Sequence, residues 1–246
     1  MENGTTTTER GMHSRTELLF GTDNLNKIQQ AKVLIFGVGG VGSWCTECLV
    51  RSGVRNITIV DFDHICITNC NRQLMATSKT VGLVKVEALR DRLLEINPDA
   101  NIICLQKTYE AETAADFHME EYDYIVDAID SLKNKVDLIL RATALPKHIT
   151  FISSMGAALR RDPFMVRKAE FWKIKGDALA RAIRNRFKRS KVFPARKFLC
   201  VYSEEPPMKN MGDSVEARTN GSLCHVTASF GNAIAGVIIN HIIDNE

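Results

Sequence analysis

The sequence lacks the long apolar run of a membrane-spanning segment. No uninterrupted apolar stretch approaches the roughly 20 residues that a membrane-spanning helix needs. The opening residues, MENGTTTTERGMHSR, contain no apolar core, so we expect no secretory signal. The hydrophobic fraction of 45% is ordinary for a globular protein in water. Together these features predict a cytoplasmic protein.

The chain also lacks a framework of paired cysteines. Its seven cysteines are an odd number without regular spacing, so we expect reduced thiols. Cys45 and Cys48 form the only C-x-x-C pair, and they fall inside a predicted helix, which favours core packing over zinc binding. Cys200 falls in an apolar strand and is expected to be buried. Cys224 is predicted at a helix N-terminus, which can lower the pKa of a thiol, so a catalytic role for it stays open.

One segment has almost no acidic residues. Residues 159–197 contain fourteen Lys and Arg against three acidic residues, a net charge of +11, and since the whole chain carries +3 the remainder carries −8. Such a segment is typical of a surface that binds a polyanion through salt-sensitive phosphate contacts, although a solvated helix face would look the same. The residues predicted to bind RNA are Arg181, Arg184, Arg186, Lys188, Arg189 and Lys191.

Strand and helix patterns alternate along the first 155 residues. Short apolar runs predict strands at 32–36, 56–61, 101–106, 122–127 and 150–153. Helical periodicity predicts helices at 23–30, 41–52, 81–96 and 132–144. This alternation predicts an α/β protein with a Rossmann-like, doubly wound and mostly parallel sheet.

After residue 156 the alternation ends. Strands predicted at 164–172 and 197–202 flank a basic helix at 177–188, which indicates a C-terminal antiparallel extension of the sheet. A mobile loop is predicted at 204–221 and a closing helix at 225–243. We therefore expect a disordered tail over residues 1–11 and a single domain over 12–246. Its nucleotide-binding half would span 12–155, and its other half 156–246.

A glycine loop follows the first predicted strand. Gly37, Gly39, Gly40 and Gly42 form the pattern G-x-G-G-x-G between a strand and a helix. In this context glycines permit a tight turn, let backbone N–H groups approach a phosphate and let the helix pack on the strand. Asp61 ends the second apolar run, where a carboxylate can accept hydrogen bonds from a ribose. The pattern predicts a nucleotide site without choosing among NAD, FAD and ATP.

Polar residues beyond Asp61 favour ATP over a nicotinamide. Arg72 offers a rigid fork of donors for phosphate oxygens, and Lys85, near the start of a predicted helix, offers a point charge. Asp130 follows the fourth strand of the sheet, where a carboxylate faces the ligand crevice and can hold Mg²⁺, although it can also cap the next helix. Asp63, Asn69 and Gln73 belong to the same predicted nucleotide site.

Several motifs in this order resemble a known superfamily. GVGGVGS, VDFD, TNCNRQ, VGLVKVE, INPDA and DAIDS resemble the ThiF/MoeB superfamily of ubiquitin-activating-like adenylating enzymes, closely over residues 14–154. SRTELLFG, the paired aspartates of DAIDS, and VYSEEP resemble its tRNA threonylcarbamoyladenosine dehydratase branch.

The resemblance implies a homodimer that binds ATP on the glycine loop. Asp61 would bind ribose, Asn69 would engage phosphate, and Asp130 the metal-bound triphosphate. The implied catalytic residues are Arg15, which would reach into the partner subunit's site, Arg72, Lys85 and Asp130.

The resemblance also implies a reaction. The enzyme would activate the threonyl carboxylate of threonylcarbamoyladenosine in tRNA with ATP and close it into a cyclic product. The main alternative is an adenylating activator of a ubiquitin-like sulfur-carrier protein, although such activators usually carry two zinc-binding C-x-x-C pairs. Some relatives work beside a cysteine desulfurase, which is included among the expected partners. An NAD(P)-dependent oxidoreductase and a catalytically inactive RNA-binding adaptor are the remaining alternatives.

Overall fold

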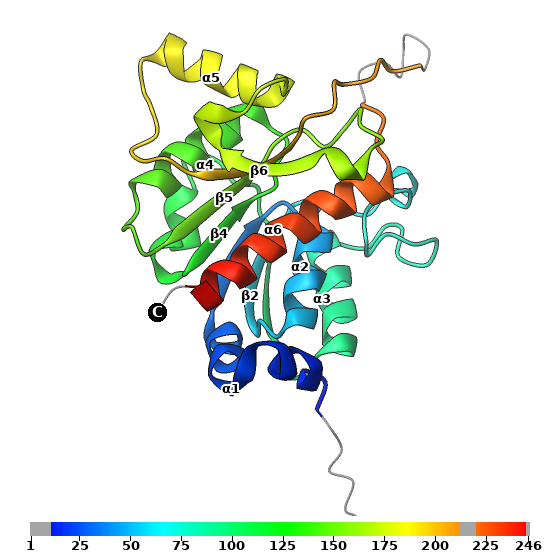
Figure 1. The fold of residues 1–246 in the computed structure, drawn as a ribbon. Coiled ribbons are helices and arrows are strands. Elements are labelled where there is room, and N and C mark those ends of the chain that lie inside the picture. Colours follow the sequence, from blue (N-terminus) through cyan, green and yellow to red (C-terminus); the bar gives the residue numbers. More distant parts are fainter. Residues whose placement is uncertain (1–10, 212–219, 245–246) are drawn as a thin grey trace, which may run out of the picture.

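The computed structural model describes residues 11–211 and 220–244 (Figure 1). The predicted tail, apart from Gly11, and the middle of the predicted loop at 204–221 lie outside the described residues.

The described residues form one seven-stranded sheet in the order β3-β2-β1-β4-β5-β7-β6. All neighbouring strands are parallel except β6 and β7, which are antiparallel. The prediction of a doubly wound, mostly parallel sheet with an antiparallel extension is therefore confirmed. The strands are β1 Lys32–Phe36, β2 Asn56–Val60, β3 Asn101–Leu105, β4 Tyr124–Asp127, β5 Thr150–Ser154, β6 Val166–Glu170 and β7 Leu199–Ser203.

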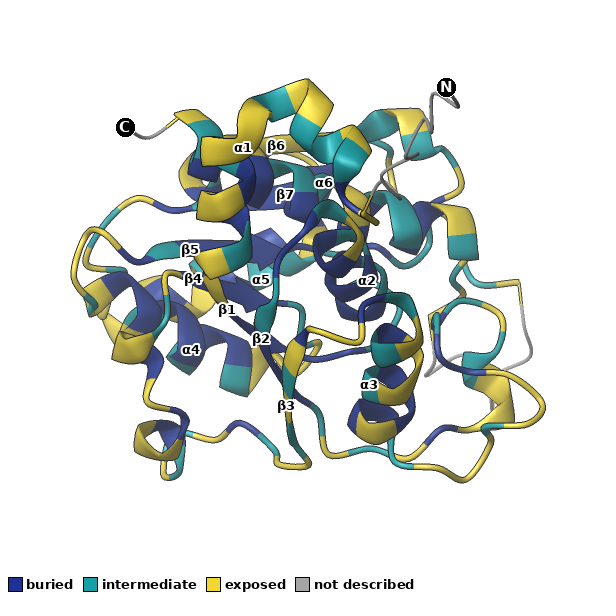
Figure 2. Ribbon diagram, turned by 90° about the horizontal axis from the view of Figure 1, so that it is seen from below, coloured by how far each residue is buried: buried dark blue, intermediate teal, exposed yellow. Residues whose placement is uncertain are grey.

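Helices cover both faces of the sheet (Figure 1). One face packs against α1 (Ser14–Gln30), α2 (Gly42–Ser52), α3 (Lys85–Ile96) and α6 (Cys224–Asp244). The other face packs against α4 (Leu132–Ala144) and α5 (Ala178–Ser190). Figure 2 shows the buried side of α2 and α4 turned toward the sheet. Each face thus has its own apolar cluster, as a two-sided parallel sheet requires.

Helix α6 is a core helix. Among the described helices it is long and apolar enough to cross a membrane, with a mean hydropathy of 1.5, yet half of that stretch is buried inside the fold. A Cβ at Gly231 would lie 2.5 Å from the carbonyl oxygen of Val41, so this glycine lets α6 approach α2 closely. The apolar side chains of α6 thereby fill the core on one face of the sheet.

Three elements differ most from the predictions. Helix α1 begins at Ser14 rather than 23, with a kink at Gly21; its apolar Leu18 and Leu19 are exposed, so core periodicity did not reveal it. Helix α3 begins at Lys85 rather than 81, because Val84 is extended and bridges to His64. The strand predicted at 164–172 is shorter, since single helical turns flank β6.

Candidate active site

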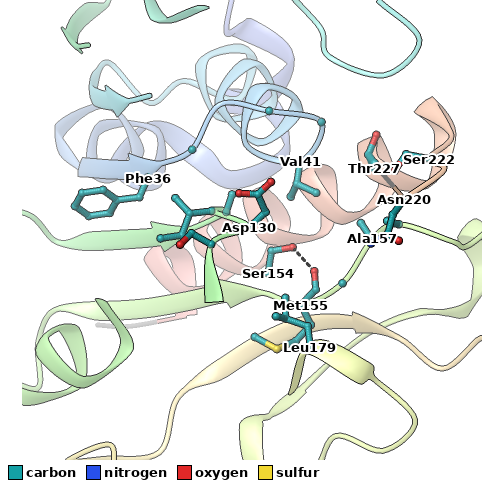
Figure 3. Close-up of a pocket in the computed structure, with 18 of the residues that line it drawn as sticks. Phe36, Val41, Asp130, Ser154, Met155, Ala157, Leu179, Asn220, Ser222 and Thr227 are labelled. Atoms are coloured by element: carbon teal, nitrogen blue, oxygen red, sulfur yellow. Dashed lines mark hydrogen bonds between the residues drawn. The ribbon is translucent and has the colours of Figure 1, made fainter. Parts of the chain in front are cut away.

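A cavity of about 700 Å³ opens at the carboxyl ends of the parallel strands (Figure 3). Phe36, Val60 and Ser154 line it from the ends of β1, β2 and β5, and Ala128 lines it directly after β4. The sheet order reverses between β1 and β4, because β1 lies between β2 and β4. Ligands of open α/β sheets bind at such a reversal, in the crevice beyond the strand ends.

The four glycines divide into two roles. Gly37 adopts φ +85°, and a Cβ there would lie 2.8 Å from the carbonyl oxygen of Ala128, so the turn requires glycine. A Cβ at Gly42 would overlap the carbonyl oxygen of Gly37, which ties this glycine to the packing of α2 on β1. Gly39 and Gly40 line the cavity, as does Gly37. The loop therefore presents backbone where a phosphate could approach.

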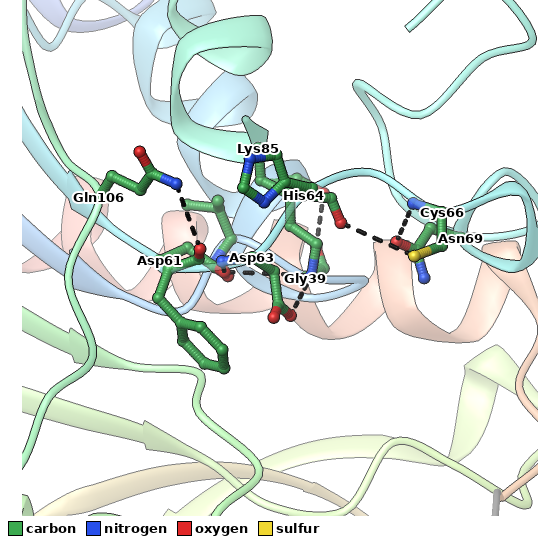
Figure 4. Close-up of polar contacts among 11 residues, drawn as sticks. Gly39, Asp61, Asp63, His64, Cys66, Asn69, Lys85 and Gln106 are labelled. Carbon is green, nitrogen blue, oxygen red and sulfur yellow. Dashed lines mark hydrogen bonds and ion pairs between the residues drawn. The ribbon is translucent and has the colours of Figure 1, made fainter. Parts of the chain in front are cut away.

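A lysine and two aspartates form the next part of the wall (Figure 4). Lys85 is 5% exposed, and its Nζ lies 2.7 Å from Asp63 Oδ2 and 3.9 Å from Asp61 Oδ1. The Asp61 carboxylate accepts hydrogen bonds from the backbone N–H groups of Val38 and Asp63, at 2.9 and 3.0 Å. Lys85, the first residue of α3, is thus held in the cavity wall near the Asp61 carboxylate, whose orientation is fixed by two backbone N–H groups.

Arg72 and Gln73 also line the cavity. Arg72 Nη1 donates to the carbonyl oxygen of Thr68 at 3.0 Å, and its own carbonyl oxygen accepts from the indole of Trp44 at 3.0 Å. Gln73 is 7% exposed, and its Oε1 is buried without a hydrogen-bond partner within the described ranges. Both predicted residues therefore stand at the site.

Asn69 does not line the cavity in the part of the chain that the structure describes. Its side-chain oxygen accepts a hydrogen bond from the backbone N–H of Cys66 at 3.0 Å and so caps a single helical turn (Figure 4). The cap occupies only the side-chain oxygen, and the expected contact of Asn69 with phosphate stays a prediction.

Asp130 lines the cavity from the loop after β4 and is exposed. It forms no hydrogen bond or ion pair with any described residue, and the cap position of α4 is Ser131. Within residues 11–211 and 220–244, no group of three or more His, Cys, Asp or Glu side chains could hold a metal ion. Mg²⁺ in nucleotide sites usually takes one or two carboxylates together with phosphates and water, and the predicted role of Asp130 in holding it stays a prediction.

Arg15 is exposed at the start of α1, and the described lining of its own chain's cavity does not include it. Its predicted role in a partner subunit's site stays a prediction.

The basic residues of α5 do not behave alike. Arg181, Arg186, Lys188, Arg189 and the following Lys191 are exposed. Arg184 instead donates to the carbonyl oxygens of Phe171 and Ile174, at 3.2 and 2.9 Å, and stacks over the Phe171 ring. The expectation that Arg184 binds RNA is thus not favoured. The helical spacing contained this signal, since Arg184 lies on the same face as the buried Ala180, Ile183 and Phe187.

Sequence reasoning missed two buried charged residues of the wall, Arg160 and Asp177. Both are buried, at 3% and 1% exposure. Asp177 caps α5 by accepting from the backbone N–H of Ala180 at 2.8 Å. The first turn of the basic helix therefore reaches the cavity, where Leu179 is seen beside Met155 (Figure 3).

The cysteines lie outside the cavity lining of the described chain. Cys45 and Cys200 are buried, as predicted, and burial raises the pKa of both thiols well above the usual value. Cys224 is the first residue of α6 and is half-buried. The two buried thiols are therefore core residues.

Known proteins resemble this chain along almost its whole length. The ThiF family matches residues 13–245. The tRNA threonylcarbamoyladenosine dehydratases of Haemophilus influenzae and Bacillus subtilis are each 34% identical, over 93% and 94% of this chain and 92% of each relative. The structure of the Escherichia coli tRNA N6-threonylcarbamoyladenosine dehydratase with ATP is 30% identical and superimposes with a TM-score of 0.84, over 96% of this chain and 95% of that one. Its complex with AMP gives a TM-score of 0.85. The resemblance predicted from the motifs is confirmed, and this chain belongs to the ThiF family.

Proposed function

We propose that this protein is an ATP-dependent dehydratase that cyclises threonylcarbamoyladenosine in tRNA. The observation that carries the proposal is a single cavity that joins the glycine loop, Arg72, Lys85 and Asp130 to the first turn of the basic helix α5. The dehydratases from three bacteria that resemble this chain do so over more than nine-tenths of its length, and one has been solved with ATP.

ATP lies with its phosphates on the glycine loop. Gly39 and Gly40 allow backbone N–H groups to approach the phosphates, and the N-terminus of α2 adds its positive dipole end. Asp61, already orientated by two backbone N–H groups, accepts hydrogen bonds from the ribose hydroxyls.

Charge on the reacting phosphates is stabilised by Arg72 and Lys85. Lys85 exchanges its contact with Asp63, whose side chain is half-exposed, for a phosphate oxygen. Asp130 would hold Mg²⁺, which would supply Lewis-acid stabilisation of the phosphate charge when bound.

The carboxylate of the substrate is the group that ATP activates. A carboxylate oxygen attacks a phosphorus atom of ATP. Attack at the α-phosphorus expels pyrophosphate and gives an acyl adenylate, and attack at the γ-phosphorus expels ADP and gives an acyl phosphate. The carbamoyl group of the same substrate then attacks the activated carbonyl carbon and closes the ring. AMP or phosphate leaves with the former carboxylate oxygen, so the nucleoside loses one water in total. The ring closes within the substrate, so no protein nucleophile is required.

The tRNA binds across the exposed basic face of α5. Arg181, Arg186, Lys188, Arg189 and Lys191 contact its phosphates, and the first turn of the same helix leads to the cavity.

The protein works as a homodimer in which Arg15 enters the partner subunit's site. Two observations support this: Arg15 is absent from the described lining of its own cavity, and the same helix exposes Leu18 and Leu19 at 76% and 73%. A mixture of Arg15→Ala and Asp130→Ala subunits should regain part of the activity that each variant lacks. A mixture as inactive as its components would contradict the assignment of Arg15.

Consumption of ATP tests the proposal. The protein should consume ATP when tRNA with threonylcarbamoyladenosine is present, and Asp130→Ala should lose that turnover while retaining tRNA binding. Turnover that requires a carrier protein instead of tRNA would support the alternative activity.

A further inference from the structure

Arg160 is a buried cation without adequate partners in the cavity wall. It lies in the segment between β5 and β6 and is 3% exposed. Its Nε and Nη1 atoms are buried and have no hydrogen-bond partner within the described ranges. Buried polar groups are almost always hydrogen-bonded, so such a guanidinium is an unusual feature.

The acidic residues near Arg160 do not form close hydrogen bonds with its guanidinium. Asp177 Oδ2 lies 3.7 Å from Arg160 Nη2, too far for a good hydrogen bond, and Oδ2 itself is buried without a hydrogen-bond partner among the described residues. The other oxygen of Asp177 caps α5. Glu205 accepts from the backbone N–H groups of Arg161 and Asp162, both at 3.0 Å. Arg160 therefore retains capacity for another anion.

The position of Arg160 separates it from the phosphate-binding residues. Arg72 lies in the segment between β2 and α3, and Lys85 is the first residue of α3, whereas Arg160 follows β5 in the chain. Arg160 Nη2 lies 3.7 Å from Asp177, the residue that caps α5. In Figure 3, Leu179 of the first turn of α5 lies across the cavity from Val41 of the glycine loop. A ligand that spans the cavity would meet phosphate-binding groups at one end and a buried guanidinium at the other.

We propose that Arg160 binds the carboxylate of the threonylcarbamoyl group. This inference rests on the proposed function. A guanidinium matches a carboxylate through two parallel hydrogen bonds, which fix the orientation of the group as well as its position. Arg160 thus selects tRNA that has the modification and turns one carboxylate oxygen toward ATP. The exposed basic face of α5, by contrast, binds any tRNA.

The test compares two tRNAs that differ only in the carboxylate-bearing group. Binding to tRNA with threonylcarbamoyladenosine is measured beside binding to the same tRNA with adenosine at that position. The wild-type protein should prefer the modified tRNA, and Arg160→Gln should reduce this preference by on the order of ten- to a hundredfold, the range for hydrogen bonds to charged groups. Affinity for ATP and for the unmodified tRNA should be unchanged in Arg160→Gln.

Asp177→Asn provides a second test with Arg160 in place. Asparagine preserves an oxygen that can cap α5 but removes the negative charge that competes for Arg160. This variant should bind the modified tRNA more tightly than the wild type does. It should also bind N-carbamoyl-L-threonine, a small carboxylate probe, more tightly than the wild type does. The methyl ester of that compound should show no such gain. These measurements remain informative if Arg160→Gln proves unstable.

Each contrary outcome has a distinct meaning. An unchanged preference in Arg160→Gln, or a weaker affinity for the carboxylate probe in Asp177→Asn, would overturn the role of Arg160 and leave the proposed function intact. A loss of ATP affinity in Arg160→Gln would assign Arg160 to a phosphate instead. A wild-type protein that prefers modified tRNA through Arg160 but makes no cyclic product would contradict the proposed function alone.

Discussion

Lys135 Nζ lies 2.8 Å from Asp127 Oδ1, and both side chains are completely buried. Asp127 Oδ2 also accepts from Ser153 Oγ at 2.6 Å, and Lys135 donates to the carbonyl oxygen of Ile129 at 2.9 Å. The ion pair therefore fastens both β5 and α4 to the start of the loop that carries Asp130. We infer that the position of the Asp130 carboxylate depends on this pair.

Removing one member of the pair should be strongly destabilising. Lys135→Met leaves the carboxylate of Asp127 buried without its cation, which should reduce the free energy of unfolding by about 3–5 kcal/mol. Urea denaturation measures this change. Lys133→Met, on the exposed part of the same helix, is the matched control and should change little. Equal stability of the two variants would show that the pair contributes nothing.

Two glycines of the loop should give opposite phenotypes. A Cβ at Gly39 would meet only the side chain of Gln73, at 3.8 Å, so Gly39→Ala should fold normally and lose affinity for ATP by about tenfold. A Cβ at Gly42 would overlap backbone, so Gly42→Ala should be destabilised by about 1–3 kcal/mol. Thermal melting and ATP titration of both variants separate the roles. Normal ATP binding by a folded Gly39→Ala would place the phosphates elsewhere.

The exposed basic residues of α5 should affect RNA binding, whereas the packed Arg184 should affect stability. Neutralising Arg186, Lys188 and Arg189 should weaken tRNA binding and flatten its dependence on salt, by about one unit of slope for each lost phosphate contact. Arg184→Gln should lower the melting temperature instead, because it removes two hydrogen bonds to backbone carbonyl oxygens. An unaltered salt slope in the triple variant would exclude this face as the RNA-binding surface.

Acid should remove the stabilisation that Glu47 provides. Burial alone would raise the pKa of Glu47, but hydrogen bonds from Arg92 and Arg51, at 2.7 and 2.8 Å, outweigh it and lower that pKa. A carboxylate whose pKa is lower in the folded state than in the unfolded state stabilises the fold at pH values above its unfolded-state pKa. This contribution disappears as the pH falls through the folded-state pKa.

Glu47→Gln should therefore be less stable than the wild type at pH 7. The difference should shrink as the pH falls below the ordinary Glu pKa of about 4.3, and it should vanish once the pH lies below the lowered pKa of folded Glu47. Chemical denaturation across this pH range measures it, with the exposed Glu87→Gln as the control. A difference that persists in acid would mean that Glu47 acts through packing rather than charge.

The sequence predicted the strands and most of the residues that line the cavity, because local patterns determine both. The carboxyl ends of parallel strands meet at one edge, so residues far apart in the chain, such as Gly39 and Asp130, were expected to line one crevice, and both do. Asn69 lies outside the described lining of the cavity, where its side-chain oxygen caps a local turn, and its contact with phosphate stays a prediction.

Contacts made outside a regular pattern could not be predicted. Arg160 and Asp177 lie 17 positions apart, in the half where strands and helices no longer alternate, and only the folded chain brings them to one wall. Lys135 looks like an ordinary solvated helix lysine until α4 packs on the sheet and buries it against Asp127.

Mass analysis of tRNA nucleosides tests the central claim most directly. The protein is incubated with ATP and tRNA that contains threonylcarbamoyladenosine, with Asp130→Ala as the control. The account predicts that the modified nucleoside loses the mass of one water with the wild-type protein and keeps its mass with the variant. An unchanged nucleoside in the wild-type reaction, while ATP is bound, would contradict it.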